Sequence, residues 1–226
     1  MAWRKSGLRV LVVVVALCSA GTGCRLPSSP PAPRQSGDVD LGLRRGVAWT
    51  TFLLRRGKVI GSTASLEIRK GKIVGFLDGG AVRLDAKADE VTGSVGGGME
   101  SRTGIGEDRR AEIDPRNTGG RVQIDIEEYD GKLDIGGTWN DDRVHIEITP
   151  ETLKGTIRGR ALGQCQYVLD KIDTDGVRSG TSICAGLPEQ TRLEFPKAVE
   201  NWLTRGEAVV VLLSLLSSAP RTSTDY

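Results

Sequence analysis

The sequence predicts a mainly β protein: a duplicated antiparallel β-meander, closing as a sandwich or open barrel, with an amphipathic C-terminal helix. Three observations predict this fold. Apolar and polar residues alternate with a period of two through most of the chain, glycine pairs separate the alternating runs, and one stretch matches another. Glycine supplies 30 of the 226 residues, about twice its usual share of ~7%, which is typical of a chain with many tight turns.

The alternation is clearest in three runs. Val122, Ile124 and Ile126 alternate with polar residues, and the same pattern holds over residues 144–148 and 82–86. Each run predicts a strand with one apolar and one wet face, as in antiparallel sheets. Glycine-containing pairs between such runs predict two-residue hairpin turns. These pairs are Arg56-Gly57, Lys70-Gly71, Asp78-Gly79 and Asp130-Gly131.

An internal repeat relates residues 81–97 to residues 143–159 without a gap. Apolar positions agree throughout, and Gly93 coincides with Gly155. We expect two meanders, each covering the apolar face of the other. The copies extend over about 64–98 and 122–160. The polar, glycine-rich residues 97–121 between them are either a binding loop or a tolerated insertion.

The last part of the chain changes period. Beyond Pro196, apolar residues recur three, four and seven positions apart. This spacing predicts an amphipathic helix over about 196–217, interrupted near Gly206, that packs on an apolar face of the sheet. Its apolar run is too short to cross a membrane. We expect one β-rich domain over residues 41–220 and a disordered tail over 221–226.

The first residues have the pattern of an export signal. Arg4, Lys5 and Arg9 precede an uncharged, mostly apolar run and then small residues before Cys24, which predicts a signal peptide over 1–23. The stretch Gly21-Thr22-Gly23-Cys24 resembles the processing site of bacterial lipoprotein precursors. The resemblance covers residues 1–24 only. It implies that Cys24 becomes the first mature residue, carries the lipid, and anchors the protein in the bacterial cell envelope, at the outer membrane or in the periplasm.

Ordinary signal-peptidase cleavage near Ala20 or Gly23 is the alternative, and it would give a soluble secreted protein. Residues 24–40 are rich in proline and serine, which predicts a flexible tether. Removal of the three basic signal residues changes the count from 31 basic and 29 acidic residues to 28 and 29. The mature chain is then slightly acidic, so we expect no nucleic-acid partner.

Cysteine usage agrees with export. Cys18 leaves with the signal and Cys24 is the lipidation site, so Cys165 and Cys184 remain. Two remaining cysteines in an oxidising compartment most simply form a disulfide with each other.

No catalytic, metal-binding or cofactor-binding motif is evident in the sequence, so we expect neither an enzyme nor a cofactor. The only histidine, His145, alternates with apolar residues beside Glu147 and is expected on an exposed strand face. Asp173-Thr-Asp175-Gly176 lacks the end ligands of a calcium-binding EF-hand loop and predicts a turn instead. Six basic residues near two hairpin tips form a candidate contact surface for anionic polymers or lipid headgroups. They are Arg55, Arg56, Lys58, Arg69, Lys70 and Lys72.

These observations together predict an exported, lipid-anchored, non-catalytic envelope or surface protein that acts in binding, adhesion or assembly. Its expected partners are the membrane, through the lipid, and an envelope protein or an anionic polymer. Two alternatives remain. An enzyme acting on cell-envelope polymer would need Asp125, Glu127 and Asp141 to converge in a cleft. A carrier for an apolar ligand would need a sizeable cavity inside the sheets.

Overall fold

The structure, a computed structural model, describes residues 37–98, 119–159, 163–173 and 176–218. These residues all belong to one unit of the chain, Gln35–Tyr226. The signal peptide, Cys24 and most of the predicted tether lie outside the described residues, as do most of the 97–121 connection and the 221–226 tail.

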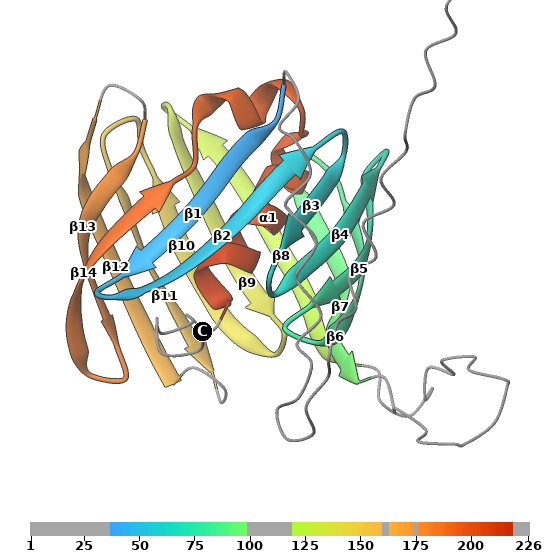
Figure 1. Cartoon of the computed structure of the whole chain (residues 1–226), viewed down its shortest axis with the longest axis horizontal. Coiled ribbons are helices and arrows are strands. Elements are labelled where there is room, and N and C mark those ends of the chain that lie inside the picture. The colour runs from blue at the N-terminus through green and yellow to red at the C-terminus, as the bar shows by residue number, and fades with distance from the viewer. Residues whose placement is uncertain (1–36, 99–118, 160–162, 174–175, 219–226) are drawn as a thin grey trace, which may run out of the picture. The chain divides into compact units, whose positions relative to one another are not determined.

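Fourteen antiparallel strands form a closed barrel (Figure 1). Each strand pairs with the next along the chain, and β14 pairs with β1 to close the sheet. The strands are β1 (Val39–Arg45), β2 (Ala48–Arg55), β3 (Lys58–Gly61), β4 (Ala64–Arg69), β5 (Lys72–Leu77), β6 (Gly80–Ala86), β7 (Glu90–Gly98), β8 (Gly120–Tyr129), β9 (Lys132–Trp139), β10 (Asp142–Ile148), β11 (Leu153–Gly159), β12 (Gly163–Ile172), β13 (Arg178–Cys184) and β14 (Leu187–Glu194). The predicted antiparallel β-meander is therefore confirmed, and it closes on itself completely.

The four predicted hairpin turns are all present. In each of them both turn residues have positive φ, for example +48° at Asp130 and +73° at Gly131, as a turn that follows the right-handed twist of the strands requires. Asn140-Asp141 and Ala185-Gly186 form further turns of this kind that the glycine pairs did not predict. Tight turns thus account for much of the simple up-and-down order of the strands.

The two faces of the sheet differ sharply. Val122, Ile124 and Ile126 are buried, whereas the alternating residues Gln123 and Asp125 are exposed. The buried side chains from all around the barrel form one apolar cluster in its interior. Polar and charged side chains dominate the outer face, which is the wet face that the alternation predicts.

The repeated segments occupy adjacent parts of the same barrel. Residues 64–98 contain β4 to β7, and residues 122–160 contain most of β8 and β9 to β11. A Cβ atom at Gly93 would lie 2.1 Å from the carbonyl oxygen of Arg83, and one at Gly155 would lie 2.4 Å from that of His145. Both glycines thus allow the same close approach of two strands in each copy, which explains why they coincide in the repeat.

The C-terminal segment enters the barrel. A short 3-10 helix, η1 (Lys197–Asn201), is followed by α1 (Arg205–Ser217), which runs inside the sheet in Figure 1. Thr204 and Glu207 form a capping box at the start of α1, so the predicted interruption lies just before Gly206. Capping satisfies backbone donors that the first helical turn leaves without partners.

The helix differs from the expectation in one respect: it is buried on all of its sides rather than along one stripe. Its buried residues are Gly206, Glu207, Val209, Val210, Val211, Leu212, Leu213, Ser214, Leu215 and Leu216. The physical reason is the width of the barrel. Eight strands leave an interior that side chains alone can fill, and larger barrels enclose a cavity. With fourteen strands, a whole helix takes that space.

Polar groups of the barrel wall fix the C-terminal end of the helix. Trp139 Nε1 donates to Ser217 Oγ at 3.1 Å, and the Tyr167 hydroxyl donates to the Leu216 carbonyl at 2.9 Å. Arg45 donates to the Ser218 carbonyl at 3.1 Å. Burial raises the pKa of Tyr167, so its hydroxyl remains a donor. These bonds specify the depth at which the helix sits.

The disulfide between Cys165 and Cys184 is present and joins directly paired positions of β12 and β13. Arg45 Nη1 lies 3.1 Å from Cys184 Sγ, on the inner side of the wall. Within the described ranges, no helix is long and apolar enough to span a membrane.

Candidate functional site

Two neighbouring hairpins bring the six predicted basic residues together. The β2–β3 turn and the β4–β5 turn lie at the same end of the barrel, because Ile68 N–H donates to the Gly57 carbonyl at 2.7 Å and Lys58 pairs with Glu67. We call the six residues the basic tips. All but Arg55 are exposed. They are Arg55, Arg56, Lys58, Arg69, Lys70 and Lys72.

Ion pairs neutralise only part of this cluster. Arg55 contacts Asp38 at 2.6 Å, and its pKa is raised by that hydrogen bond. Arg69 contacts Glu67 at 2.5 Å. The other four basic tips, Arg56, Lys58, Lys70 and Lys72, form no ion pair within the described part of the chain. The tips therefore retain a local positive charge.

The basic tips lie where the chain enters the barrel. β1 begins at Val39, and the ion pair between Asp38 and Arg55 holds that entry against the end of β2. The same wall also exposes apolar side chains on its outer face: Ile60 of β3 is 45% exposed, and Val74 and Phe76 of β5 are 48% and 40% exposed. Charge and apolar surface therefore occur side by side on β2 to β5.

The three carboxylates of the enzyme hypothesis do not share a cleft. Asp125 and Glu127 project from the exposed face of β8. Asp141 lies in the β9–β10 turn, where its Oδ1 accepts a hydrogen bond from the backbone N–H of Arg121 at 3.0 Å. Arg121 and Asp125 are four residues apart on β8, which is about 13 Å. The geometry therefore gives this hypothesis no site at these residues.

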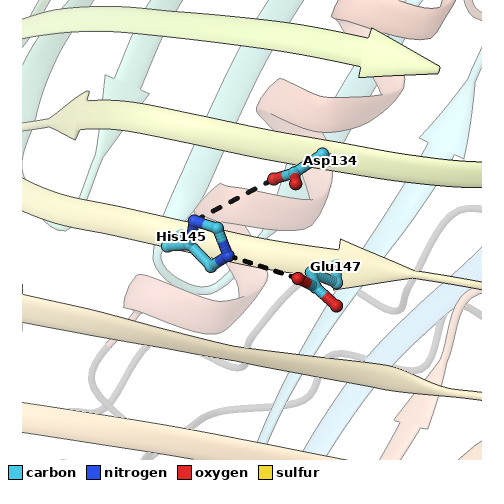
Figure 2. Close-up of side chains that lie close together, drawn as sticks. All are labelled: Asp134, His145 and Glu147. Carbon is cyan, nitrogen blue, oxygen red and sulfur yellow. Dashed lines mark ion pairs between the residues drawn. The ribbon is translucent and has the colours of Figure 1, made fainter. Parts of the chain in front are cut away.

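His145 lies on the outer face of β10, as expected, between two carboxylates (Figure 2). Its Nδ1 is 3.9 Å from Asp134 Oδ1, and its Nε2 is 3.6 Å from Glu147 Oε1. Two carboxylates and an imidazole are donors that zinc accepts. However, the ammonium of Lys132 already lies 2.9 Å from Glu147 and 3.9 Å from Asp134.

The pKa values in this cluster reflect the same contacts. The pKa of Lys132 is raised by side-chain hydrogen bonding with Tyr129 and Glu147. The pKa of Glu147 is lowered, chiefly by its hydrogen bond with Lys132 and to a smaller extent by His145. Because Lys132 supplies the positive charge that a metal would otherwise bring, we interpret the cluster as a surface ion-pair network.

Within the described part of the chain, helix α1 packs against the inner wall of the barrel, where a carried apolar ligand would have to lie. Val210, Val211 and Leu213 of α1 are fully buried among the side chains of the wall. The helix lies against β1, β2, β6 and β7, and its last turn bonds to Trp139 of β9 and Tyr167 of β12. The helix thus occupies the space in which a carried ligand would lie.

A groove on the outer wall was not anticipated from the sequence. It has a volume of about 470 Å³ and lies over β14, β1 and β2. Two rows of paired positions line it: Arg192, Arg44 and Trp49 form one row, and Glu194, Gly42 and Thr51 form the other. The sequence contains one indication of this groove. Ala48 and Thr50 fall on one face of their strand, so Trp49 between them falls on the opposite, polar face.

The chain matches no family model, no curated protein and no solved structure. Its function must therefore be argued from its own surfaces.

Proposed function

We propose that the protein is an exported, lipid-anchored, non-catalytic envelope protein that binds, through the basic tips, the anionic surface of the membrane that holds its anchor. One observation carries the proposal: two adjacent hairpins gather Arg56, Lys58, Lys70 and Lys72, which form no ion pair with any described residue, beside the point where the chain enters the barrel. The filled interior is consistent with a protein that makes its contacts from the outside.

Chain length places this surface near the anchor. Cys24 precedes Asp38 by fourteen residues, and an extended chain spans at most about 3.6 Å per residue, or about 50 Å in all. A lipid on Cys24 would therefore hold the end of the barrel that bears Asp38 within about 50 Å of the membrane. The basic tips are at that end, so their charge can reach the headgroups.

The expected free energy of the contact is modest. Each basic residue close to an anionic leaflet contributes about 1 kcal/mol, so the four basic tips without ion pairs contribute about 4 kcal/mol. Ile60 and Val74 each lie two residues from a basic tip on the same wall, and their apolar side chains can enter the headgroup region beside the basic residues.

Vesicle sedimentation tests the proposal without the lipid. Residues 24–226 carrying Cys24→Ser are mixed with vesicles of phosphatidylcholine, with and without phosphatidylglycerol. We expect binding only to the anionic vesicles, and we expect it to weaken steeply as salt is added. Changing the four basic tips without ion pairs to glutamine should abolish binding.

A matched variant supplies the control. Four exposed basic residues on β10 to β12 change to glutamine in it, so that the net charge falls by the same amount. They are Arg143, Lys154, Arg158 and Lys171. Equal loss of binding in both variants would mean that net charge alone acts, and the proposal would fail. It would also fail if the protein bound a soluble acidic polymer but no anionic vesicle. Mass spectrometry of the N-terminus tests lipidation of Cys24 separately.

A further inference from the structure

We infer that the groove over β14, β1 and β2 is a binding site for an acidic saccharide, that is, a sugar carrying a carboxylate or phosphate group. This inference is independent of the membrane contact, because the groove and the basic tips share no residue. It is carried by three observations: the groove itself, an exposed tryptophan that lines it, and Arg44, which lines it without a carboxylate partner among the described residues.

Gly42 lies at an outward position of β1 and has no side chain of its own. Its direct partners on the neighbouring strands are Thr51 and Glu194. A Cβ atom at Gly42 would lie 3.4 Å from Glu194 Oε2, so the Glu194 carboxylate lies over Gly42 and forms part of the groove. The volume of about 470 Å³ is within the usual range of small-molecule sites.

Trp49 supplies a platform in the groove. Its side chain is 46% exposed, although it belongs to a strand whose other face is buried in the core. Tryptophan combines a large apolar ring with a polar N–H, which suits it to ligands that have both characters. The apolar face of a sugar ring can stack on the indole, while Thr51 and Glu194 offer hydrogen-bond partners to its hydroxyl groups.

Arg44 is the residue that would select a negative charge. Arg44 and Arg192 are direct partners across β1 and β14, and like charges in that position repel each other. Arg192 is offset by Glu194 at 3.1 Å and Asp173 at 3.8 Å. Arg44 has no carboxylate partner within the described residues, and its Nε donates to the Gly46 carbonyl at 3.1 Å. That bond leaves the terminal amino groups of Arg44 for an anion, which arginine binds with two parallel hydrogen bonds.

A second arginine pair shows which feature distinguishes the groove. Arg143 and Arg158 also face each other, on β10 and β11. The third member of their row is Thr138 of β9 rather than a tryptophan. Two opposed arginines are therefore not a site by themselves, and their combination with Trp49 and the groove is what indicates a saccharide. The pair also provides a matched control.

The test uses tetragalacturonic acid as the acidic probe and maltotetraose as the neutral one. Residues 24–226 with Cys24→Ser contain Trp49, Trp139 and Trp202, so the indole N–H signals in a ¹⁵N–¹H NMR spectrum are few and easily assigned. We expect titration of tetragalacturonic acid to about 10 mM, a range that detects millimolar dissociation constants, to shift the Trp49 signal alone. Maltotetraose should cause a much smaller shift.

Substitutions then identify the residues that bind the acidic probe. Trp49→Ala and Arg44→Gln should each weaken binding, the latter about 10-fold to 100-fold as a charged hydrogen-bonding group is lost. Arg143→Gln should leave binding unchanged. Each variant is first checked for folding by circular dichroism, since all three sites are on the wet face.

Several results would overturn the inference. They are no shift at Trp49, equal affinity for the neutral probe, an equal shift with inorganic phosphate alone, and unchanged binding in Arg44→Gln. Vesicle binding separates this proposal from the previous one. Trp49→Ala should still bind anionic vesicles, and the variant lacking the four basic tips should still bind tetragalacturonic acid.

Discussion

Helix α1 fills the barrel, and this can be tested by shortening side chains on its opposite sides. Leu213 and Leu215 are two residues apart and therefore about 160° apart around a helix, and neither side chain is exposed. We expect Leu213→Ala and Leu215→Ala to destabilise the protein by similar, large amounts. A helix lying on the outside of a sheet would bury one of these leucines and expose the other.

The size of the effect follows from the surroundings. Leu-to-Ala changes in cores cost about 2–5 kcal/mol, and the cost is lowest where neighbouring groups can collapse into the space. Here the neighbours belong to a closed, hydrogen-bonded sheet, which cannot contract around a smaller helix. We therefore expect about 3–5 kcal/mol at each position, in the upper part of that range.

Urea unfolding measures the two costs. With a slope of about 2–3 kcal/mol per molar urea, each variant should shift the unfolding midpoint by about 1–2.5 M. Leu187→Ala is the control, since Leu187 is 67% exposed, and it should change stability by less than about 0.5 kcal/mol. A cost below about 1 kcal/mol at either Leu213 or Leu215 would refute the enclosed helix.

Three further predictions concern other parts of the molecule. Replacing both Cys165 and Cys184 by serine should lower the free energy of unfolding by about 3 kcal/mol, because a crosslink over their 19-residue separation reduces the entropy of the unfolded chain. Urea unfolding with and without reductant measures this loss. Equal stability of the variant and the original protein would contradict the prediction. Glu207→Ala should lower the free energy of unfolding by about 2–4 kcal/mol, because two backbone N–H groups that donate to this buried carboxylate at 2.9 and 2.8 Å lose their acceptor. Glu207→Gln keeps an acceptor oxygen, so thermal unfolding should show a smaller loss of stability. Lys132→Met should raise the pKa of Glu147 towards its ordinary value of 4.5, as followed by NMR titration. Because the folded pKa of Glu147 lies below the unfolded one, its contribution to stability is complete above pH 4.5 and is lost as the pH falls through the folded pKa; an unchanged pKa in the variant would contradict the ion pair.

Local features of the fold could be predicted because they depend only on adjacent residues. Asp130-Gly131 meets the requirement of its turn for positive φ in the two residues themselves. Ala185 also has a φ of +51°, but alanine rarely adopts this conformation, so no local feature indicated that turn. Closure into a barrel depends on how β1 meets β14, which are joined by no local pattern.

The helix illustrates a second limit on what the sequence pattern can predict. The spacing of apolar residues predicted a helix with one buried stripe, and the helix is present. Its run from Val209 to Leu216 is, however, almost continuously apolar, which is the pattern of a helix buried all round. That interpretation becomes compelling only when the number of strands is known, since only a wide barrel has room for a helix inside it.

The two proposed surfaces differ in how far sequence alone could lead to them. The basic tips are adjacent because consecutive hairpins are adjacent, so their clustering follows from the order of residues in the chain. The groove joins β14 to β1, and Arg192 is almost 150 residues from Arg44; no local pattern brings them together. Along β2, Trp49 and Arg55 are six residues apart, which is about 20 Å. A barrel held to a membrane by its basic tips would therefore keep the groove clear of the headgroups, so the two contacts can be made at the same time.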